Sequence, residues 1–283
     1  MKNNLFGYRI KRHGIYDAIS KILVFTGAVL MTLPIIWLIA SSFKHQMEIY
    51  QLPPVLFSRR PTLDNLRQLF VDSKALQWLT NSTLVSLFTT IGTIITGTMA
   101  AYAFSKLNFY GRKTLFIIFV SSIMIPNEVM IVPLFNLILK LKLQNTITGM
   151  ALPAIASAIG FFMMKGFIDS ISDSMRESAK IDGASEFMIF YRIILPMCKP
   201  GIGALFILTF VRSWNNYLWQ LLMGTQKSSM TLMVGVSTLF SDIDPNMALK
   251  VAGAAIGAVP MLVVFFVFQK YFTRGISMGA VKG

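Results

Sequence analysis

The chain has few residues of the kinds that form covalent links, metal sites or nucleotide sites. Cys198 is the only cysteine among 283 residues, so no disulfide can form within the chain. The two histidines, His13 and His45, are isolated and far apart, which leaves no Cys/His spacing typical of a metal centre. The pattern Gly-x-x-x-x-Gly-Lys followed by Ser or Thr is absent, so this chain has no phosphate-binding P-loop for ATP. No apolar run contains a nucleophile–base pair, which disfavours an intramembrane enzyme.

Charge is also scarce. Charged residues make up 13% of the chain and hydrophobic residues 54%, a composition typical of a protein that crosses the membrane several times. The net charge of +14 raises the alternative of nucleic-acid binding. Basic residues gather in the N-terminus, after the second apolar run, across 165–199 and at the C-terminus, so their distribution follows membrane topology. We therefore expect contact with anionic lipid headgroups and no nucleic-acid partner.

Apolar runs predict an all-α integral membrane protein with a transmembrane domain over 22–272. The expected spans are 22–40, 84–104, 115–139, 147–168, 202–223 and 251–268. The first run is as long as a full span and lacks a clear cleavage site, so we interpret it as a retained span and not as a signal peptide. Pro126 and Pro133 interrupt the third span, and Asn81 is expected to cap the second.

The charge distribution also sets the orientation. Six spans place both termini on one side, and the positive-inside rule places that side in the cytoplasm. Segments 1–21 and 273–283 are thus predicted to be a cytoplasmic N-terminus and a cytoplasmic tail. Segment 43–82, which is polar and contains Pro53-Pro54, is expected to be an extracytoplasmic loop.

Residues 174–196 hold a dense group of charges between two apolar runs. Ser174 and Glu177 have the spacing of a capping box and predict a helix start. Asp182-Gly183 then predicts a break, because glycine tolerates the left-handed conformation that ends a helix. A second helix should follow, ended by prolines. One side of it carries Ala184, Phe187, Met188, Tyr191 and Leu195 at spacings of three and four, and the prolines are Pro196 and Pro200.

Segment 174–196 resembles the EAA loop of ABC-importer permeases, and we therefore call it the coupling loop. The matching residues are Glu177, Ser178, Ala179, Gly183, Ile193, Leu195 and Pro196, at the intervals of that pattern. Ser178 departs from it, since the family has alanine there, but both residues are small. The resemblance implies a helix that docks in a cleft of a separate ATPase subunit. On this reading Glu177, Ser178, Ala179, Asp182 and Gly183 shape that helix. Phe187 and Met188 would fill the cleft.

Two ionisable residues lie inside predicted spans. Glu128 lies 13 residues after Leu115, and Arg212 lies 10 residues after Ile202, so both are expected at a similar depth. Ionisable groups inside a membrane face protein or water. The two side chains are therefore expected either to pair with each other or to line a translocation path, and a purely structural ion pair is an equal alternative.

An aromatic and amide segment follows Arg212. Trp214, Asn215, Asn216 and Tyr217 combine rings with amide groups, a combination that suits sugars, whose C–H faces stack on rings while their hydroxyls bond to amides. The alternative is an aromatic belt at the outer interface, which fits Trp219 better than Trp214 or Asn215. We interpret the four residues as candidates for the substrate path.

Together these segments resemble the smaller, maltose-type permease subunit of carbohydrate ABC importers. Further matching segments are 81–83, 100–104, 124–126 and 279–283. The resemblance implies the type I importer permease fold, with a second permease, two ATPase copies that bind ATP and Mg, and an extracytoplasmic solute-binding protein. No cofactor is expected in this chain. Residues 224–249 occupy the place of a loop that reaches toward the binding protein.

Two alternatives stay open. The substrate could be glycerol 3-phosphate or a related phosphodiester, carried by relatives of this branch, and Arg212 would suit its phosphate. A stand-alone secondary transporter would explain the proline-interrupted third span but not the coupling loop.

Overall fold

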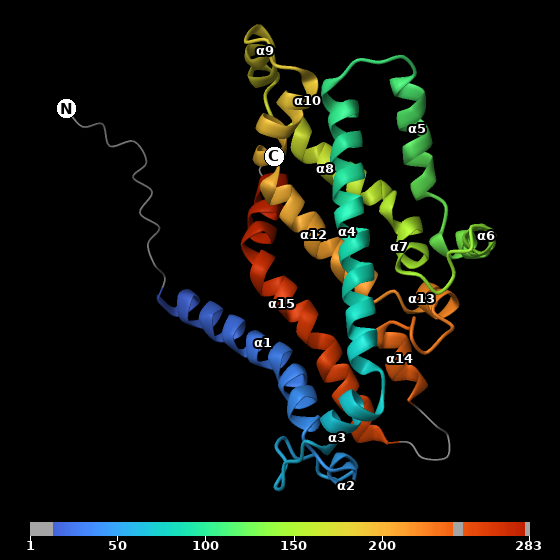
Figure 1. Ribbon diagram of the computed structural model, residues 1–283. Coiled ribbons are helices and arrows are strands. Elements are labelled where there is room, and N and C mark those ends of the chain that lie inside the picture. Colours follow the sequence, from blue (N-terminus) through green and yellow to red (C-terminus); the bar gives the residue numbers. More distant parts are fainter. Residues whose placement is uncertain (1–13, 240–245, 281–283) are drawn as a thin grey trace.

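The computed structural model describes residues 14–239 and 246–280, and within them it contains helices and no strand. The chain opens with α1 (Gly14–Ser41), α2 (Gln46–Ile49), α3 (Asp64–Arg67) and the π-helical turn η1 (Gln68–Asp72). The membrane bundle then comprises α4 (Ala75–Lys106), α5 (Arg112–Ile123), α6 (Asn127–Lys140), α7 (Ile147–Ile155) and α8 (Ala158–Asp169). After the coupling loop come α12 (Lys199–Trp214), α13 (Tyr217–Met223), α14 (Leu232–Thr238) and α15 (Met247–Ala280). The architecture is the all-α fold that the apolar runs predict (Figure 1).

Three helices are long and apolar enough to cross a membrane, namely α1, α4 and α15. Three pairs of helices meet the same criteria together but are bent at a short break: α5 with α6, α7 with α8, and the end of the coupling loop with α12. The described residues therefore offer between three and six spans. The first two pairs divide the expected spans 115–139 and 147–168 into two segments each, whereas the third bend lies before the expected span 202–223.

The third expected span, 115–139, is not one helix. Its two halves, α5 and α6, meet at an angle of 103°. Pro126 lies at the start of α6 with φ −60° and ψ 135°, an extended conformation that no α-helix continues. Pro126 has no N–H and keeps the residue before it out of the helical region, so the chain turns here. Pro133 is accommodated inside α6.

The fourth and fifth expected spans, 147–168 and 202–223, also break, in each case next to a capping side chain. Ser157 accepts a hydrogen bond from the Gly160 N–H and starts α8, which lies at 50° to α7. Asn216 accepts one from the Trp219 N–H and starts α13. Serine and asparagine offer the backbone an alternative partner to the helix, and they end it where a hydropathy window still looks apolar.

Helix boundaries move outward in the remaining spans. The second helix, α4, starts at Ala75 and not near Leu84, because its first turns carry polar residues that lower the local hydropathy. Asn81 lies inside α4 and does not cap it, contrary to our expectation; its amide donates to the carbonyls of Ser228 and Met230, both at 2.9 Å. Residues 14–21 belong to α1, and α15 continues to Ala280 through most of the predicted tail. Residues 1–13, 240–245 and 281–283 lie outside the described part.

Helix α4 is the centre of the bundle and packs against α7, α8, α12 and α14. Its contact with α8 is close because glycines face each other: a Cβ at Gly97 would lie 3.2 Å from the Gly160 backbone, and one at Gly160 would lie 2.8 Å from the Thr93 methyl. Thr96 also donates to the Ile155 carbonyl at 3.0 Å. In lipid, where burial gives no driving force between helices, such close packing and hydrogen bonding hold them together.

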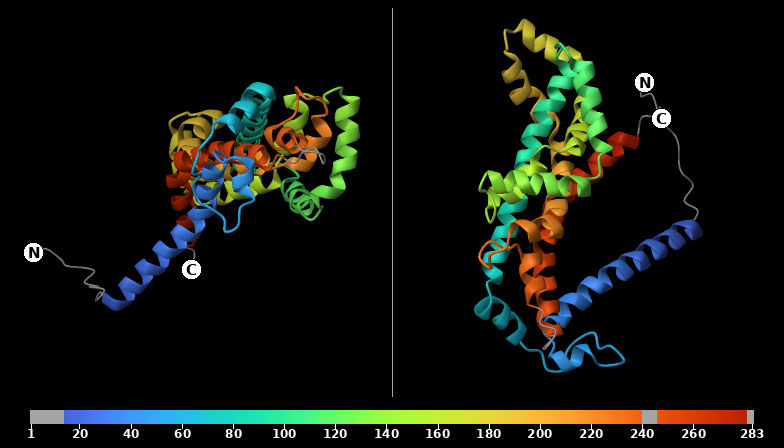
Figure 2. Two further views of the ribbon diagram at one scale, coloured as in Figure 1. Left: turned by 90° about the horizontal axis from the view of Figure 1, so that it is seen from below. Right: turned by 90° about the vertical axis from the view of Figure 1, so that its right-hand side faces the viewer.

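Helix α1 stands apart from the bundle. It approaches the other helices at its C-terminal end only, beside α15, and diverges from them toward its N-terminus (Figures 1 and 2). None of its most apolar 18-residue window is buried within this chain.

Candidate functional site

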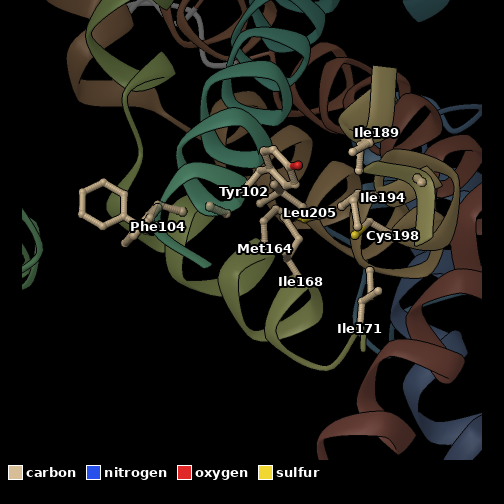
Figure 3. Packing of buried hydrophobic residues seen from close by; sticks show 12 residues of the cluster. Tyr102, Phe104, Met164, Ile168, Ile171, Ile189, Ile194, Cys198 and Leu205 are labelled. Carbon is tan, nitrogen blue, oxygen red and sulfur yellow. The ribbon is translucent and has the colours of Figure 1, made fainter. Parts of the chain in front are cut away.

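The coupling loop forms one end of the molecule, opposite to the end that carries α2 and α3 (Figure 1). It folds into α9 (Asp173–Ile181), α10 (Glu186–Ile189), the π-helical turn η2 (Phe190–Ile194) and α11 (Leu195–Met197). Ile189 and Ile194 point into a buried apolar cluster together with Tyr102, Met164 and Ile168 (Figure 3). The loop is therefore anchored on the bundle by packing.

Helix α9 starts slightly before the predicted capping box. Ser172 is the N-cap, and its hydroxyl accepts from the Ser174 N–H at 3.3 Å, so Ser174 and Glu177 do not form the box. Serine at position 172 satisfies the same requirement two residues earlier, because either hydroxyl can bind the free N–H groups of the first turn. The prediction of the helix is confirmed, and its capping residue was wrong.

Gly183 ends α9 in the way the sequence predicts. Its φ is +79°, in the left-handed region that glycine adopts at little cost. The Ala184 N–H donates to the Ala179 carbonyl at 2.9 Å, and the Gly183 N–H donates to the Lys180 carbonyl at 3.0 Å. These two bonds make a Schellman motif, which fixes the direction in which α10 leaves α9. Pro196 does not end the second helix but lies within α11, and the axis turns by 75° at Cys198.

Large apolar side chains project from the coupling loop. Phe187 is 72% exposed and Ile181 87% exposed, and Met175, Met188 and Tyr191 are exposed as well. Glu177, Ser178 and Asp182 are exposed, whereas Ala179 packs on the cluster. The apolar group lies outside the long helices and next to polar side chains, which is typical of a protein-binding surface. Phe187 and Met188 were predicted as contact residues, and Ile181 was missed.

A polar cluster centred on Glu186 ties the loop together. Its carboxylate accepts hydrogen bonds from Arg176 of α9 and from the Tyr102 hydroxyl of α4, the latter at 2.6 Å. Lys180 of α9 lies 2.7 Å from the same carboxylate. One side chain thus joins α4, α9 and α10.

A second bond joins α4 to the start of α9. The Lys106 ammonium, whose side chain is almost wholly buried, donates to the Ile171 carbonyl at 2.6 Å and to the Asp173 carboxylate at 2.7 Å. Sequence reasoning missed Tyr102, Lys106 and Glu186, since the contacts of Tyr102 and Lys106 with the coupling loop span 65 to 84 residues of sequence. The only signal for them was the concentration of charge in the loop.

These contacts keep Glu186 ionised. Hydrogen bonds from Arg176, with further ones from Lys180 and Tyr102, outweigh partial burial and lower the pKa of Glu186 from 4.5 to about 2. The same pairing raises the pKa of Arg176, and the Lys106 ammonium lowers the pKa of Asp173.

The lowered pKa predicts a pH window for stability. Because Glu186 titrates lower in the folded than in the unfolded chain, its contribution is complete above about pH 4.5 and is lost as the pH falls toward 2. We expect the wild-type chain to unfold at a higher temperature than Glu186→Gln at pH 7, and the two to converge below pH 4.5. Thermal unfolding in detergent measures this, with the exposed Glu177→Gln as control. A gap that stays constant from pH 7 to pH 2.5 would contradict it.

Glu128 and Arg212 do not pair in this structure. Glu128 lies in the first turn of α6 and Arg212 in the last turn of α12, and both are exposed. The four ion pairs among the described residues involve neither of them. Of the two roles expected for them, the ion pair is absent, and the role in a path stays a prediction.

Trp214 occupies a different place from the one expected. It is 1% exposed, stacks on Phe210 and donates from its indole N–H to the Gly257 carbonyl at 3.1 Å. It holds α12 against α15 and presents no face to a substrate. Trp219 is also buried and donates to the Met150 carbonyl at 3.0 Å, so it does not belong to an aromatic belt.

Three of the aromatic and amide candidates stay accessible. Asn215, Asn216 and Tyr217 are exposed at the break between α12 and α13. The Asn215 amide donates to the Val211 carbonyl, and the Tyr217 hydroxyl lies 3.1 Å from the Ser237 hydroxyl. Arg212, in the last turn of α12, is exposed as well, and we call these four residues the polar strip.

The loop after α13 is fixed to the rest of the chain. The Asn145 side-chain oxygen accepts from the backbone N–H groups of Thr225 and Gln226 and from the Ser229 hydroxyl. On α4, the Trp78 indole donates to the Lys227 carbonyl at 2.7 Å. Residues 224–231 are thus a defined surface at the start of α4, remote from the coupling loop.

Known proteins resemble this chain over almost its whole length. It is 34% identical to the arabinooligosaccharides transport system permease protein AraQ of Bacillus subtilis (strain 168), over 90% of this chain and 92% of that protein. It is 30% identical to the sn-glycerol-3-phosphate transport system permease protein UgpE of Pectobacterium atrosepticum, over 94% and 97%.

A solved structure and a family model match as well. A chain of a bacterial ABC transporter involved in the import of the acidic polysaccharide alginate superimposes with a TM-score of 0.78 at 23% identity, over 95% of this chain and 99% of that one. Residues 92–278 match the family of binding-protein-dependent transport system inner membrane components. That segment holds the coupling loop and the bent helix pairs, and the chain belongs to this family.

Proposed function

We propose that this chain is a permease subunit of an ABC importer that moves a sugar across the cytoplasmic membrane, driven by ATP hydrolysis in a separate subunit. The observation that carries the proposal is the structure of the coupling loop. It exposes large apolar side chains, Phe187 among them, while Ile189 and Ile194 of the same loop pack into the buried cluster of the bundle. A surface of this kind fits a cleft in an ATPase that binds ATP and Mg. Family membership supports the same reading.

The exposed helix α1 supports a second permease as partner. A span with none of its apolar window buried has most of its surface free to pack against another subunit. The family description adds a solute-binding protein, for which the fixed surface at 224–231 is the candidate contact. On this arrangement the coupling loop and both termini face the cytoplasm, in agreement with the distribution of basic residues.

A sugar is the substrate class that the accessible strip favours. Asn215, Asn216 and Tyr217 offer amide and hydroxyl groups, and the relative AraQ is named for arabinooligosaccharides. Glycerol 3-phosphate is the second candidate, because Arg212 is exposed, forms none of the ion pairs among the described residues, and the relative UgpE is named for that substrate. Glu128, Arg212 and the three strip residues are the proposed substrate-path residues.

Uptake in cells tests both candidates. A strain lacking the chain is compared with the same strain complemented, using radiolabelled arabino-oligosaccharide, galacto-oligosaccharide, lactose and glycerol 3-phosphate. We expect ATP-dependent uptake of an oligosaccharide that falls about tenfold or more in Asn215→Ala, as the loss of a buried substrate hydrogen bond costs about 1.4 kcal/mol or more. Uptake of glycerol 3-phosphate alone, lost in Arg212→Gln, would select the second candidate. Uptake independent of ATP would contradict the importer reading.

A further inference from the structure

Two buried polar side chains on the last turns of α4 bind the coupling loop. Tyr102 and Lys106 are four residues apart, so they lie on the same face of α4. Tyr102 binds Glu186 of α10, and Lys106 binds Asp173 and the Ile171 carbonyl at the start of α9. The contacts bridge 84, 67 and 65 residues of sequence, so they join elements that the backbone does not hold together.

Two points of attachment constrain the loop more than one does. Helices α9 and α10 meet at the Gly183 turn, and each would be free to pivot about it if only one were held. Here α9 is bound through Asp173, α10 through Glu186, and the two are bound to each other by Arg176 and Lys180 on the same carboxylate. Hydrogen bonds are directional, whereas apolar packing is not, so these bonds fix an orientation that the apolar cluster alone would let slide.

The far end of α4 is bound in the same manner to the loop at 224–231. The Trp78 indole donates to the Lys227 carbonyl at 2.7 Å. The Asn81 amide donates to the carbonyls of Ser228 and Met230, both at 2.9 Å. Helix α4 has 32 residues without a proline, which corresponds to about 48 Å of continuous helix. It is a straight connection between the two ends of the molecule (Figure 1).

The other route out of the coupling loop is less direct. Helix α12 follows α11 in the chain, but the axis turns by 75° at Cys198. A second break at Asn215–Asn216 separates α12 from α13. A displacement of the coupling loop would have to pass two bends on this route and none along α4.

We propose that Tyr102, Lys106 and Glu186 are positioning residues that make α4 and the coupling loop one rigid body, so that movement of the ATPase is carried along α4 to the loop at 224–231. The proposal rests on the proposed function, since it needs an ATPase on the coupling loop. On this proposal α4 is the rigid helix that connects the coupling loop, where the ATPase would bind, with the loop at 224–231, where a binding protein would dock.

The test measures movement at the far end of α4 in the purified complex with its partners. Gln77 is exposed in the first turn of α4, and Cys198, the only native cysteine of this chain, is buried, so Gln77→Cys gives this chain a single reactive thiol, whose labelling is followed on the band of this chain. The rate of maleimide labelling is compared without nucleotide and after trapping with ATP and vanadate. We expect the two rates to differ about fivefold or more, the lower range for coupling between distant sites, and the difference to fall toward onefold in Tyr102→Phe and Glu186→Leu.

Controls separate positioning from stability. Glu186→Gln keeps an acceptor for the Tyr102 hydroxyl and should retain part of the rate difference, and Lys113→Gln, which removes an exposed charge from the first turn of α5, should leave all of it. Tyr102→Phe keeps the ring in the apolar cluster, so the ATPase should still co-purify and hydrolyse ATP. A full labelling difference in Tyr102→Phe and Glu186→Leu, or none in the unaltered complex that hydrolyses ATP, would overturn the proposal. Failure of any ATPase to co-purify with the unaltered chain would instead count against the proposed function.

Discussion

Replacing Phe187 with aspartate is expected to release the ATPase from the permease. The Phe187 side chain is 72% exposed, so the substitution removes an apolar contact without disturbing the core of this chain. Aromatic residues at the centre of an interface cost about 2 kcal/mol or more when lost, and an added charge that must be desolvated costs further. We expect the affinity for the ATPase to fall at least about thirtyfold and uptake to stop, measured by co-purification and by transport.

The control for this variant is Phe57→Asp. Phe57 is similarly exposed, but it belongs to the loop between α2 and α3 at the opposite end of the molecule. It should leave ATPase recruitment unchanged. Equal loss in both variants would mean that a new charge harms the membrane protein in general, and that Phe187 has no particular role.

Gly160→Leu is expected to disrupt the bundle. A Cβ at this position would lie 2.8 Å from the Thr93 methyl of α4, and a full leucine side chain would have to force α8 away from the helix that organises the fold. Overpacking costs about 1 to 3 kcal/mol, and more where backbones are in contact. We expect a large fall in the thermal unfolding temperature and in the yield of folded protein from membranes.

Gly166→Leu is the matched control because it introduces the same side chain into the same helix. Nothing lies within 4 Å of a Cβ built at Gly166. The two substitutions share the change in helix propensity, so the difference between their unfolding temperatures isolates the contact between α4 and α8. If both lowered the temperature equally, the close approach of α4 and α8 would have no role in stability.

What could be predicted from the sequence was governed by short-range chemistry. The Gly183 turn is such a case, since the left-handed conformation depends on the residue itself and on its neighbours. Pro126 is another, because a proline has no N–H and keeps the residue before it out of the helical region, although Pro133 is accommodated inside α6 and the angle of 103° depends on what α6 packs against. The helix at α9 was predicted for the same reason, with its cap displaced by two residues.

What could not be predicted depends on contacts between distant parts of the chain. Trp214 is an aromatic residue next to two asparagines, as is common in sugar-binding sites. Its packing role becomes clear only from the hydrogen bond between its indole and the Gly257 carbonyl. Glu186 also binds Arg176 and Lys180 of the same loop, but its bond to the bundle comes from Tyr102, 84 residues away in the sequence. The helix breaks at Ser157 and Asn216 were not predicted, because a single polar capping residue hardly changes the average hydropathy of a span.

The isolation of α1 has a consequence for how the complex is put together. Lipid is as apolar as the helix surface, so a span that touches little of its own chain is stable in the bilayer before a partner binds it. The chain can therefore complete its bundle before it meets another subunit, with α1 attached to the rest at one end. The tilt of α1 is then set in the finished complex, and the exposed surface of α1 contributes to the choice of the second permease in the proposed assembly.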